Sequence, residues 1–144
     1  MSDAPYTNPL FNAALPHVQA WLASCQNSED LLSGNRLSDY ALWSYQRDAM
    51  GVGTLELINN PSISLGANLL ALSLSLDLPP IQSPDEAYLL FSLSDAFDGA
   101  AIVCKGDDHT LAVQLKVPLA DVTAETLPNL YARLTKAKRF LEEP

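Results

Sequence analysis

The sequence contains two histidines, the residue type that most often acts as a general base, at His17 and His109. Neither stands at a recognisable spacing from a nucleophile, and no serine occurs in the motif Gly-x-Ser-x-Gly. His17 falls in the turn that opens a predicted helix, and His109 falls in a predicted hairpin turn, so we expect both imidazoles to be solvated. The sequence therefore predicts no catalytic residue and a protein that is not an enzyme.

Two short motifs could bind a metal ion or a phosphate, and we interpret both as structural. Asp107, Asp108 and His109 are consecutive residues in a turn, and consecutive side chains cannot easily converge on one ion. The sequence GVG at 51–53 lacks the Lys-Ser/Thr pair of a phosphate-binding loop and the third glycine of a dinucleotide-binding turn, which leaves flexibility before a strand. We predict no metal site and no cofactor.

The charge of the chain argues against two classes of partner. The 144 residues include 17 acidic and 8 basic residues, which gives a formal net charge of −9. Nucleic acids and anionic membrane surfaces repel a field of that sign, so we expect no nucleic acid and no membrane as partners. The length suits one core, and we predict a single domain over residues 1–144.

The cysteines and the first residues predict a cytoplasmic protein. Cys25 and Cys104 stand alone in apolar surroundings without a Cys-x-x-Cys motif, which favours buried free thiols in a reducing compartment. The first residues, MSDAPYTNPLF, carry an acid where a secretory signal needs positive charge, and no segment has the ~20 apolar residues of a membrane span.

The first half of the chain predicts one helix followed by strands. Apolar residues recur every three or four positions over 10–25, but Pro16 should interrupt the helix, so we expect its main part to begin there and residues 8–14 to form a separate turn. For residues 26–51 we expect a loop with a short strand or helix. Alternation then predicts three antiparallel strands at 53–59, 62–66 and 69–78, with a turn at Asn59–Asn60–Pro61.

The second half predicts a helix, a hairpin and a final helix. Ser83 and Pro84 are typical of a helix start, and apolar residues line one side of 83–97. Residues 98–119 predict two strands around a turn at 106–109, and a last helix opens near Thr123. The fold class is α+β: an antiparallel sheet of about five strands with three main helices, in the order α-β-β-β-α-β-β-α.

The stretch LLALSLSLD, residues 69–77, alternates leucine with small or polar residues. A strand with this pattern places its leucines on one face and its serines on the other. We expect the leucines to face the helices, and the serines and Asp77 to face solvent or a partner.

One pattern spans residues 83–143. A helix with a Leu-Leu pair is followed by a strand opened by glycine, a turn, a strand ending in Pro-Leu, and a final helix led by threonine. The residues that carry it are Leu89, Leu90, Gly99, Ile102, Asp107, Asp108, Leu111, Val113, Val117, Pro118, Leu119, Thr123, Leu127 and Phe140. This pattern resembles the second half of the type III secretion chaperone fold, which small acidic effector chaperones of the Tir-chaperone type share with YbjN-like proteins.

The resemblance implies a homodimer that binds an extended segment of a secreted effector protein through apolar patches and added strand pairing, without nucleotide hydrolysis. For the contact with this client polypeptide we predict a first-helix group and a strand edge, although ordinary core residues remain the alternative: Leu15, Val18, Trp21, Leu22, Leu55 and Leu57. The helix 83–97 carries more apolar residues than one small core needs, so we predict a dimer interface at Tyr88, Leu89, Leu93 and Phe97.

Two other functions stay open. A YbjN-like adaptor or regulatory protein would have the same fold. A small enzyme or ligand-binding domain could build its site from residues 26–51, which supply varied polar and aromatic chemistry: Arg36, Asp39, Tyr40, Trp43, Tyr45, Arg47 and Asp48.

Overall fold

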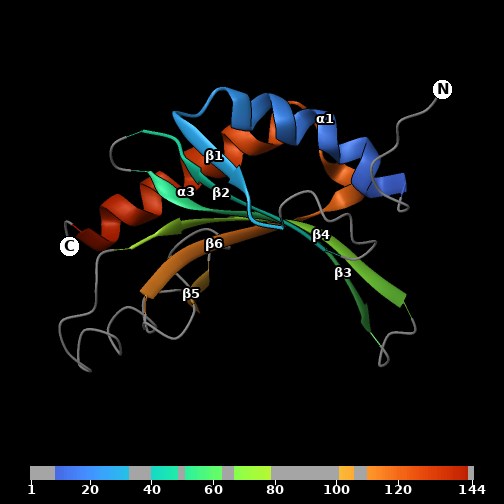
Figure 1. Ribbon diagram of the computed structural model, residues 1–144. Helices are drawn as coiled ribbons and strands as arrows, with labels where there is room; N and C mark the ends of the chain where they lie inside the picture. Colours follow the sequence, from blue (N-terminus) through green and yellow to red (C-terminus); the bar gives the residue numbers. More distant parts are fainter. Residues whose placement is uncertain are drawn as a thin grey trace.

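The computed structural model describes residues 9–32, 40–48, 51–62, 67–78, 101–105 and 110–142. Figure 1 shows a curved sheet with two long helices, α1 and α3, lying side by side over one of its faces. The elements are α1 (Pro9–Ala23), β1 (Asn27–Asp30), β2 (Tyr40–Gln46), β3 (Val52–Ser62), β4 (Ala67–Asp77), β5 (Ala101–Lys105), β6 (Thr110–Pro118), the short 3-10 helix η2 (Leu119–Asp121) and α3 (Thr126–Glu142).

The described strands form one sheet of six, in the order β1-β2-β3-β4-β6-β5, and every neighbouring pair is antiparallel. The predicted α+β class and the antiparallel sheet are confirmed. Residues 26–51 supply β1 and β2, so the expected short strand is present and a second one pairs with it. The predicted hairpin of residues 98–119 is confirmed as β5 paired with β6, and its turn lies outside the described residues.

The core fills the space between the sheet and the two helices. In β2, for example, the buried residues Ala41, Trp43 and Tyr45 alternate with half-buried ones, as a strand with one covered face requires. The largest fully buried side chains come from both helices and from the central strands: Phe11, Val18, Leu55, Leu57, Leu72, Leu74, Leu76, Leu111, Val113, Leu127 and Leu134.

The first helix does not begin at Pro16, as the sequence predicted, because α1 is continuous from Pro9 to Ala23 with Pro16 inside it. A proline inside a helix removes one hydrogen bond and costs about 3 kcal/mol. Both parts of α1 nevertheless bury side chains against the same core, and this packing keeps the helix continuous. The buried residues are Phe11, Ala14, Leu15, Val18, Trp21 and Leu22.

The turn predicted at residues 59–61 is also wrong, because this stretch lies within β3. Pro61 is the register partner of Asn68 in β4, whereas the pairing of β3 with β2 ends at Tyr40 and Ile58. Proline is tolerated where a strand pairs on one side, since the N–H that it lacks can belong to the unpaired side. Residues 53–59 and Ser62 therefore belong to one strand, and the rest of the predicted strand 62–66 lies outside the described residues.

The final helix begins as predicted, at a pair of capping threonines. Thr123 Oγ1 accepts a hydrogen bond from the Glu125 amide at 3.3 Å, and Thr126 Oγ1 accepts one from the Thr123 amide at 2.8 Å. These bonds satisfy amides that a helix start leaves without partners. The predicted helix 83–97, with the interface residues assigned to it, lies outside the described residues.

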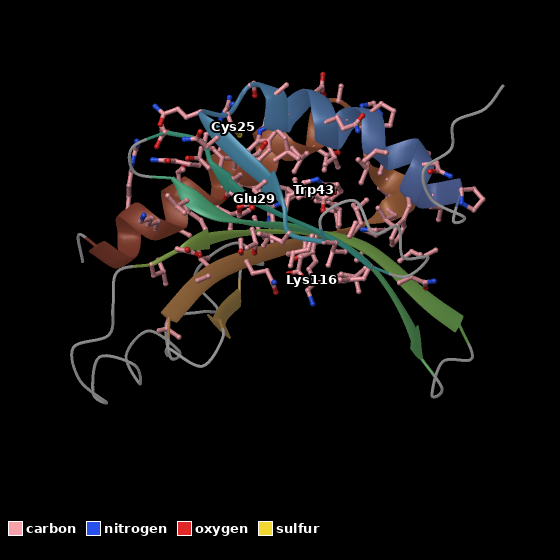
Figure 2. All side chains as sticks on the ribbon, in the orientation of Figure 1. Cys25, Glu29, Trp43 and Lys116 are labelled. Carbon is pink, nitrogen blue, oxygen red and sulfur yellow. The ribbon has the colours of Figure 1, made fainter. Side chains whose placement is uncertain are left out.

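The two faces of β4 differ, as the stretch LLALSLSLD predicted. Its leucines 72, 74 and 76 are buried on the side of the helices. Figure 2 shows Trp43 on that same side of the sheet and Lys116, the register partner of Ser73, on the opposite side. Ser73 and Ser75 are only 1% and 2% exposed, however, so the expectation that they face solvent is wrong. Longer side chains on both neighbouring strands flank these small residues, among them Glu56 beside Ser73.

The two buried serines should respond differently to removal of the hydroxyl. Ser75 Oγ lies 2.7 Å from Thr54 Oγ1, whereas Ser73 Oγ has no hydrogen-bond partner. Losing a satisfied buried hydroxyl costs about 1 kcal/mol, and losing an unsatisfied one costs nothing or stabilises the fold. We therefore expect Ser75→Ala to lower the free energy of unfolding in urea by about 1 kcal/mol and Ser73→Ala to leave it equal or higher. Equal losses in both variants would contradict the assigned hydrogen bonds.

Candidate functional site

The six residues predicted to contact a client are brought together, but inside the core. Their exposed fractions are all small: Leu15 6%, Val18 0%, Trp21 5%, Leu22 7%, Leu55 0% and Leu57 0%. These residues therefore lie in the core, which was the alternative to contact with a client. Direct contact between these side chains and a client stays a prediction.

The prediction that a strand edge lies near Leu55 and Leu57 is wrong. Leu55 has a register partner on each side, Trp43 in β2 and Leu74 in β4, so this part of β3 lies inside the sheet. The reason is that residues 26–51 add two strands beyond β3. The outer strands of the described sheet are β1 and β5.

The β1 edge is short, polar and exposed. Its sequence is NSED, and the first three of these residues are exposed. The amide of Leu31 donates to the carbonyl oxygen of Leu42 in β2 at 3.0 Å. Because inward and outward amides alternate along an antiparallel strand, the N–H groups of Ser28 and Asp30 point away from β2. The N–H of Ser28 and its carbonyl oxygen therefore point outward from this edge of the described sheet.

A cavity of about 230 Å³ lies between the end of α1 and the beginning of α3. Figure 2 shows where the end of α1 lies, because Cys25, two residues after the helix, is labelled at the corner between α1 and β1. The cavity is lined from α1, from the segment after β2 and from the start of α3, by His17, Ala20, Trp21, Ser24, Arg47, Ala124 and Pro128.

Arg47 is held at the cavity by contacts with the end of α1. Its Nη1 donates to Ser24 Oγ, and its guanidinium carbon lies 5.5 Å from the centre of the Trp21 ring. Ser24 Oγ in turn donates to the Trp21 carbonyl oxygen at 2.6 Å. Nη1 also lies 4.0 Å from the sulfur of Cys25, whose pKa burial raises. A raised pKa keeps this thiol protonated and unreactive at neutral pH.

Three aromatic rings pack beside the cavity and join α1, β2 and α3. The ring centres of Trp21 and Tyr45 are 5.0 Å apart, and those of Trp21 and Tyr131 are 5.8 Å apart. Both distances lie in the range of favourable aromatic pairs. Tyr45 also donates a buried hydrogen bond to the Ser75 carbonyl oxygen at 2.7 Å, and Tyr131 donates to Asp48 Oδ2 at 3.4 Å.

The glycines of the GVG motif allow close packing, and flexibility before a strand is not needed to explain them. A Cβ at Gly51 would collide with the Tyr131 hydroxyl, and a Cβ at Gly53 would collide with the Ser75 carbonyl oxygen. The motif that resembled part of a phosphate loop is therefore explained by close packing.

The polar residues of 26–51 are not gathered into one site. Trp43 and Tyr45 are buried in the core, and Tyr40 donates to Glu56 Oε2 at 2.6 Å. Arg47 lines the cavity, and Asp48 accepts from the Gly51 amide at 2.8 Å. Arg36 and Asp39 lie outside the described residues.

The described residues contain neither a candidate metal site nor a helix that could span a membrane. No group of three or more His, Cys, Asp or Glu side chains in that part of the chain could hold a metal ion. No helix within the same residues has the length and apolar character needed to cross a membrane.

Comparisons with known proteins identify the fold. No protein-family model and no curated protein matches the chain. Among solved structures, it is similar to a chain of the "HopA1-SchA Chaperone-Effector Complex", with 17% identity, a TM-score of 0.52, and 72% of this chain and 76% of that chain covered. It is also similar to a chain of the "ExsC-ExsE Complex", with 17% identity, a TM-score of 0.55, and 74% and 78% covered. The chain therefore has a type III secretion chaperone-like fold.

The aromatic cluster should make the fold sensitive to alkali. Burial, and then the nearby Asp48 carboxylate, raise the pKa of Tyr131 to about 12, and burial raises the pKa of Tyr45 as well. An unfolded tyrosine ionises near pH 10, so the unfolded chain loses protons first above that value. We expect the free energy of unfolding to be constant below about pH 9 and to fall as the pH rises from about 10 to 12. Urea titrations across this range would show it.

Tyr131→Phe is the matched control, because it removes one of these hydroxyls. Its stability should fall less steeply with alkaline pH than that of the unmodified protein. A stability that does not change between about pH 9 and 12, or an unchanged slope in the variant, would contradict this assignment.

Proposed function

We propose that this protein is a small acidic chaperone that binds an extended segment of a secreted effector and keeps it competent for secretion. In this proposal it is a cytoplasmic homodimer, folded as one domain over residues 1–144, and it hydrolyses no ATP. Its partner is the effector or another client polypeptide, and neither a nucleic acid nor a membrane. The fold shared with a chain of a chaperone–effector complex supports this class of function.

The exposed edge of β1 is the observation that carries the proposal. An unpaired strand edge accepts another strand through main-chain hydrogen bonds, which is a common way of binding an extended peptide. The outward amide of Ser28 supplies a donor for such pairing. An extended client segment added beside β1 would continue the sheet by one strand.

The charge of the molecule selects the client. The net charge is −9, and the β1 edge itself carries Glu29, which is exposed, and Asp30. Opposite or neutral charge on the approaching segment speeds and selects the encounter, while apolar contacts supply most of the affinity. The client segment therefore carries apolar anchors between basic or neutral residues, and its binding weakens only moderately as salt is added.

The YbjN-like adaptor has the same fold, so the bound partner separates the two functions. Purification from the native host, followed by mass spectrometry of the retained polypeptides, is the direct experiment. A chaperone should retain one dominant secreted protein through a segment that is disordered when free. Turnover of a metabolite with no retained polypeptide would instead support a small enzyme.

We predict a homodimer with an interface at Tyr88, Leu89, Leu93 and Phe97. Analytical ultracentrifugation at micromolar concentration should find two chains per particle. An aspartate in an apolar interface is strongly unfavourable, so Leu93→Asp should give a folded monomer. A monomer before substitution would contradict the dimer, and an unfolded Leu93→Asp chain would place Leu93 in the core.

We also predict that blocking the β1 edge releases the client. Ser28→Pro removes an outward amide, and proline on an edge strand leaves the pairing of β1 with β2 in place. The substituted protein should keep its urea midpoint and lose the retained polypeptide. Ser28→Ala keeps the amide and serves as the matched control, which should retain the client. Equal retention by both variants would mean that the client does not pair with β1.

A further inference from the structure

Arg47 makes no salt bridge with a carboxylate within the described part of the chain. Its interactions there are with Ser24 Oγ, Cys25 Sγ and the face of Trp21. A guanidinium has five N–H groups, and these contacts engage Nη1 and the face of the ion. A half-buried arginine without an acidic partner is unexpected in a chain with 17 acidic and 8 basic residues.

The carboxylate of the next residue, Asp48, lies near the same Cys25 thiol and Tyr131 hydroxyl that the Arg47 charge acts on. Its hydrogen bonds, however, go to groups other than Arg47. Asp48 Oδ1 accepts the Gly51 amide at 2.8 Å, and its Oδ2 accepts the Tyr131 hydroxyl at 3.4 Å. These bonds tie Asp48 to the turn before β3 and to α3. Arg47 is therefore held against Trp21 and at the cavity wall without its neighbour's carboxylate as an ion-pair partner.

The cavity wall beside Arg47 includes Trp21, whose indole nitrogen is buried beneath the cavity surface. Trp21 is 5% exposed, and its buried indole nitrogen, Nε1, donates to no hydrogen-bond partner. An indole nitrogen can only donate, and leaving a buried donor unsatisfied is costly. His17, on the same wall, can supply a further N–H. The third wall comes from the start of α3, where the helix dipole is positive.

We infer that this cavity is a binding site for a carboxylate side chain, an aspartate or glutamate of the bound polypeptide. This inference rests on the proposed function, because it names one residue of the client. The Arg47 guanidinium forms the ion pair, beside the face of the Trp21 ring. A carboxylate carries one negative charge, which the single guanidinium balances, whereas a phosphate dianion would leave one charge unbalanced.

The position of the cavity agrees with a client strand on β1. Asn27 of β1 pairs with Gln46 of β2, and the cavity residues Ser24 and Arg47 flank this end of the pair along the chain. A segment that adds to β1 can therefore pass close to the cavity at the Asn27 end. The client would carry one acidic residue at that point, within a segment that is otherwise apolar, basic or neutral.

The test uses a probe that carries the side chain alone. N-acetyl-glutamate α-amide is titrated into the full ¹⁵N-labelled chain at constant ionic strength, and the two tryptophan indole resonances are followed by NMR. N-acetyl-glutamine α-amide is the uncharged match. We expect a saturable shift of the Trp21 indole resonance with the glutamate probe, and none with the glutamine probe.

Substitutions then locate the bound charge. Arg47→Gln should weaken binding of the glutamate probe by about ten- to a hundred-fold, as for other hydrogen bonds to charged groups. Arg139→Gln changes the net charge equally at an exposed position on α3 and should leave binding unchanged. If Arg47→Gln does not fold, the comparison of the two probes on the unmodified protein still decides the question.

Several results would overturn the inference. These are no saturable shift, an equal shift with the glutamine probe, or an equal loss in both arginine variants. Inorganic phosphate is titrated in the same way, and tighter binding of phosphate that depends on Arg47 would replace the carboxylate with a phosphate as the ligand.

The same variants keep this inference separate from the proposed function. If the protein retains a client but the probe does not bind, the cavity assignment fails and the chaperone function stands. If the probe binds but no polypeptide is retained, the cavity is an anion site and the chaperone function fails. If both hold, Arg47→Gln should reduce retention of the client without abolishing it, because the β1 edge is intact.

Discussion

The structure depends on the burial of one face of β4 beneath the two helices. Leu72, Leu74 and Leu76 are 0% exposed, and β4 pairs with β3 on one side and β6 on the other. Burying these three side chains contributes roughly 5 to 9 kcal/mol, which is comparable with the whole stability of a small domain. The helices must therefore cover this face of the sheet.

The aromatic cluster connects this core to the surface on which function is proposed. Trp21, Tyr45 and Tyr131 come from three elements and pack together beside Gly51, which precedes β3, and Gly53, which lies in β3. Their packing holds the end of α1 against the sheet. Arg47 stacks on the outer face of the same cluster, so its guanidinium is held in place before any ligand arrives. A preorganised group loses less entropy on binding than a mobile one.

Local sequence signals failed where tertiary packing opposed them. Pro16 predicted a helix start, but apolar residues before and after it bury against one core, and the helix is continuous. Asn59, Asn60 and Pro61 predicted a turn, but pairing with β4 extends β3 through them. Serines 73 and 75 predicted a face open to solvent or to a partner, but both are almost fully buried in the described structure. Each signal describes a local preference of about 1 to 3 kcal/mol, which many packing contacts together can exceed.

The sequence by itself determined the α+β class, the antiparallel pairing and the two-faced character of β4, because side-chain alternation is a local property of a strand. The resemblance to type III secretion chaperones was also readable from its element order. The tertiary structure alone decided which strand is an edge, because that depends on pairing between distant segments. It alone also brought Arg47 to Trp21, which lies 26 positions earlier in the sequence, beside a cavity that the start of α3 closes. No spacing along the chain could reveal a site built from three separate elements.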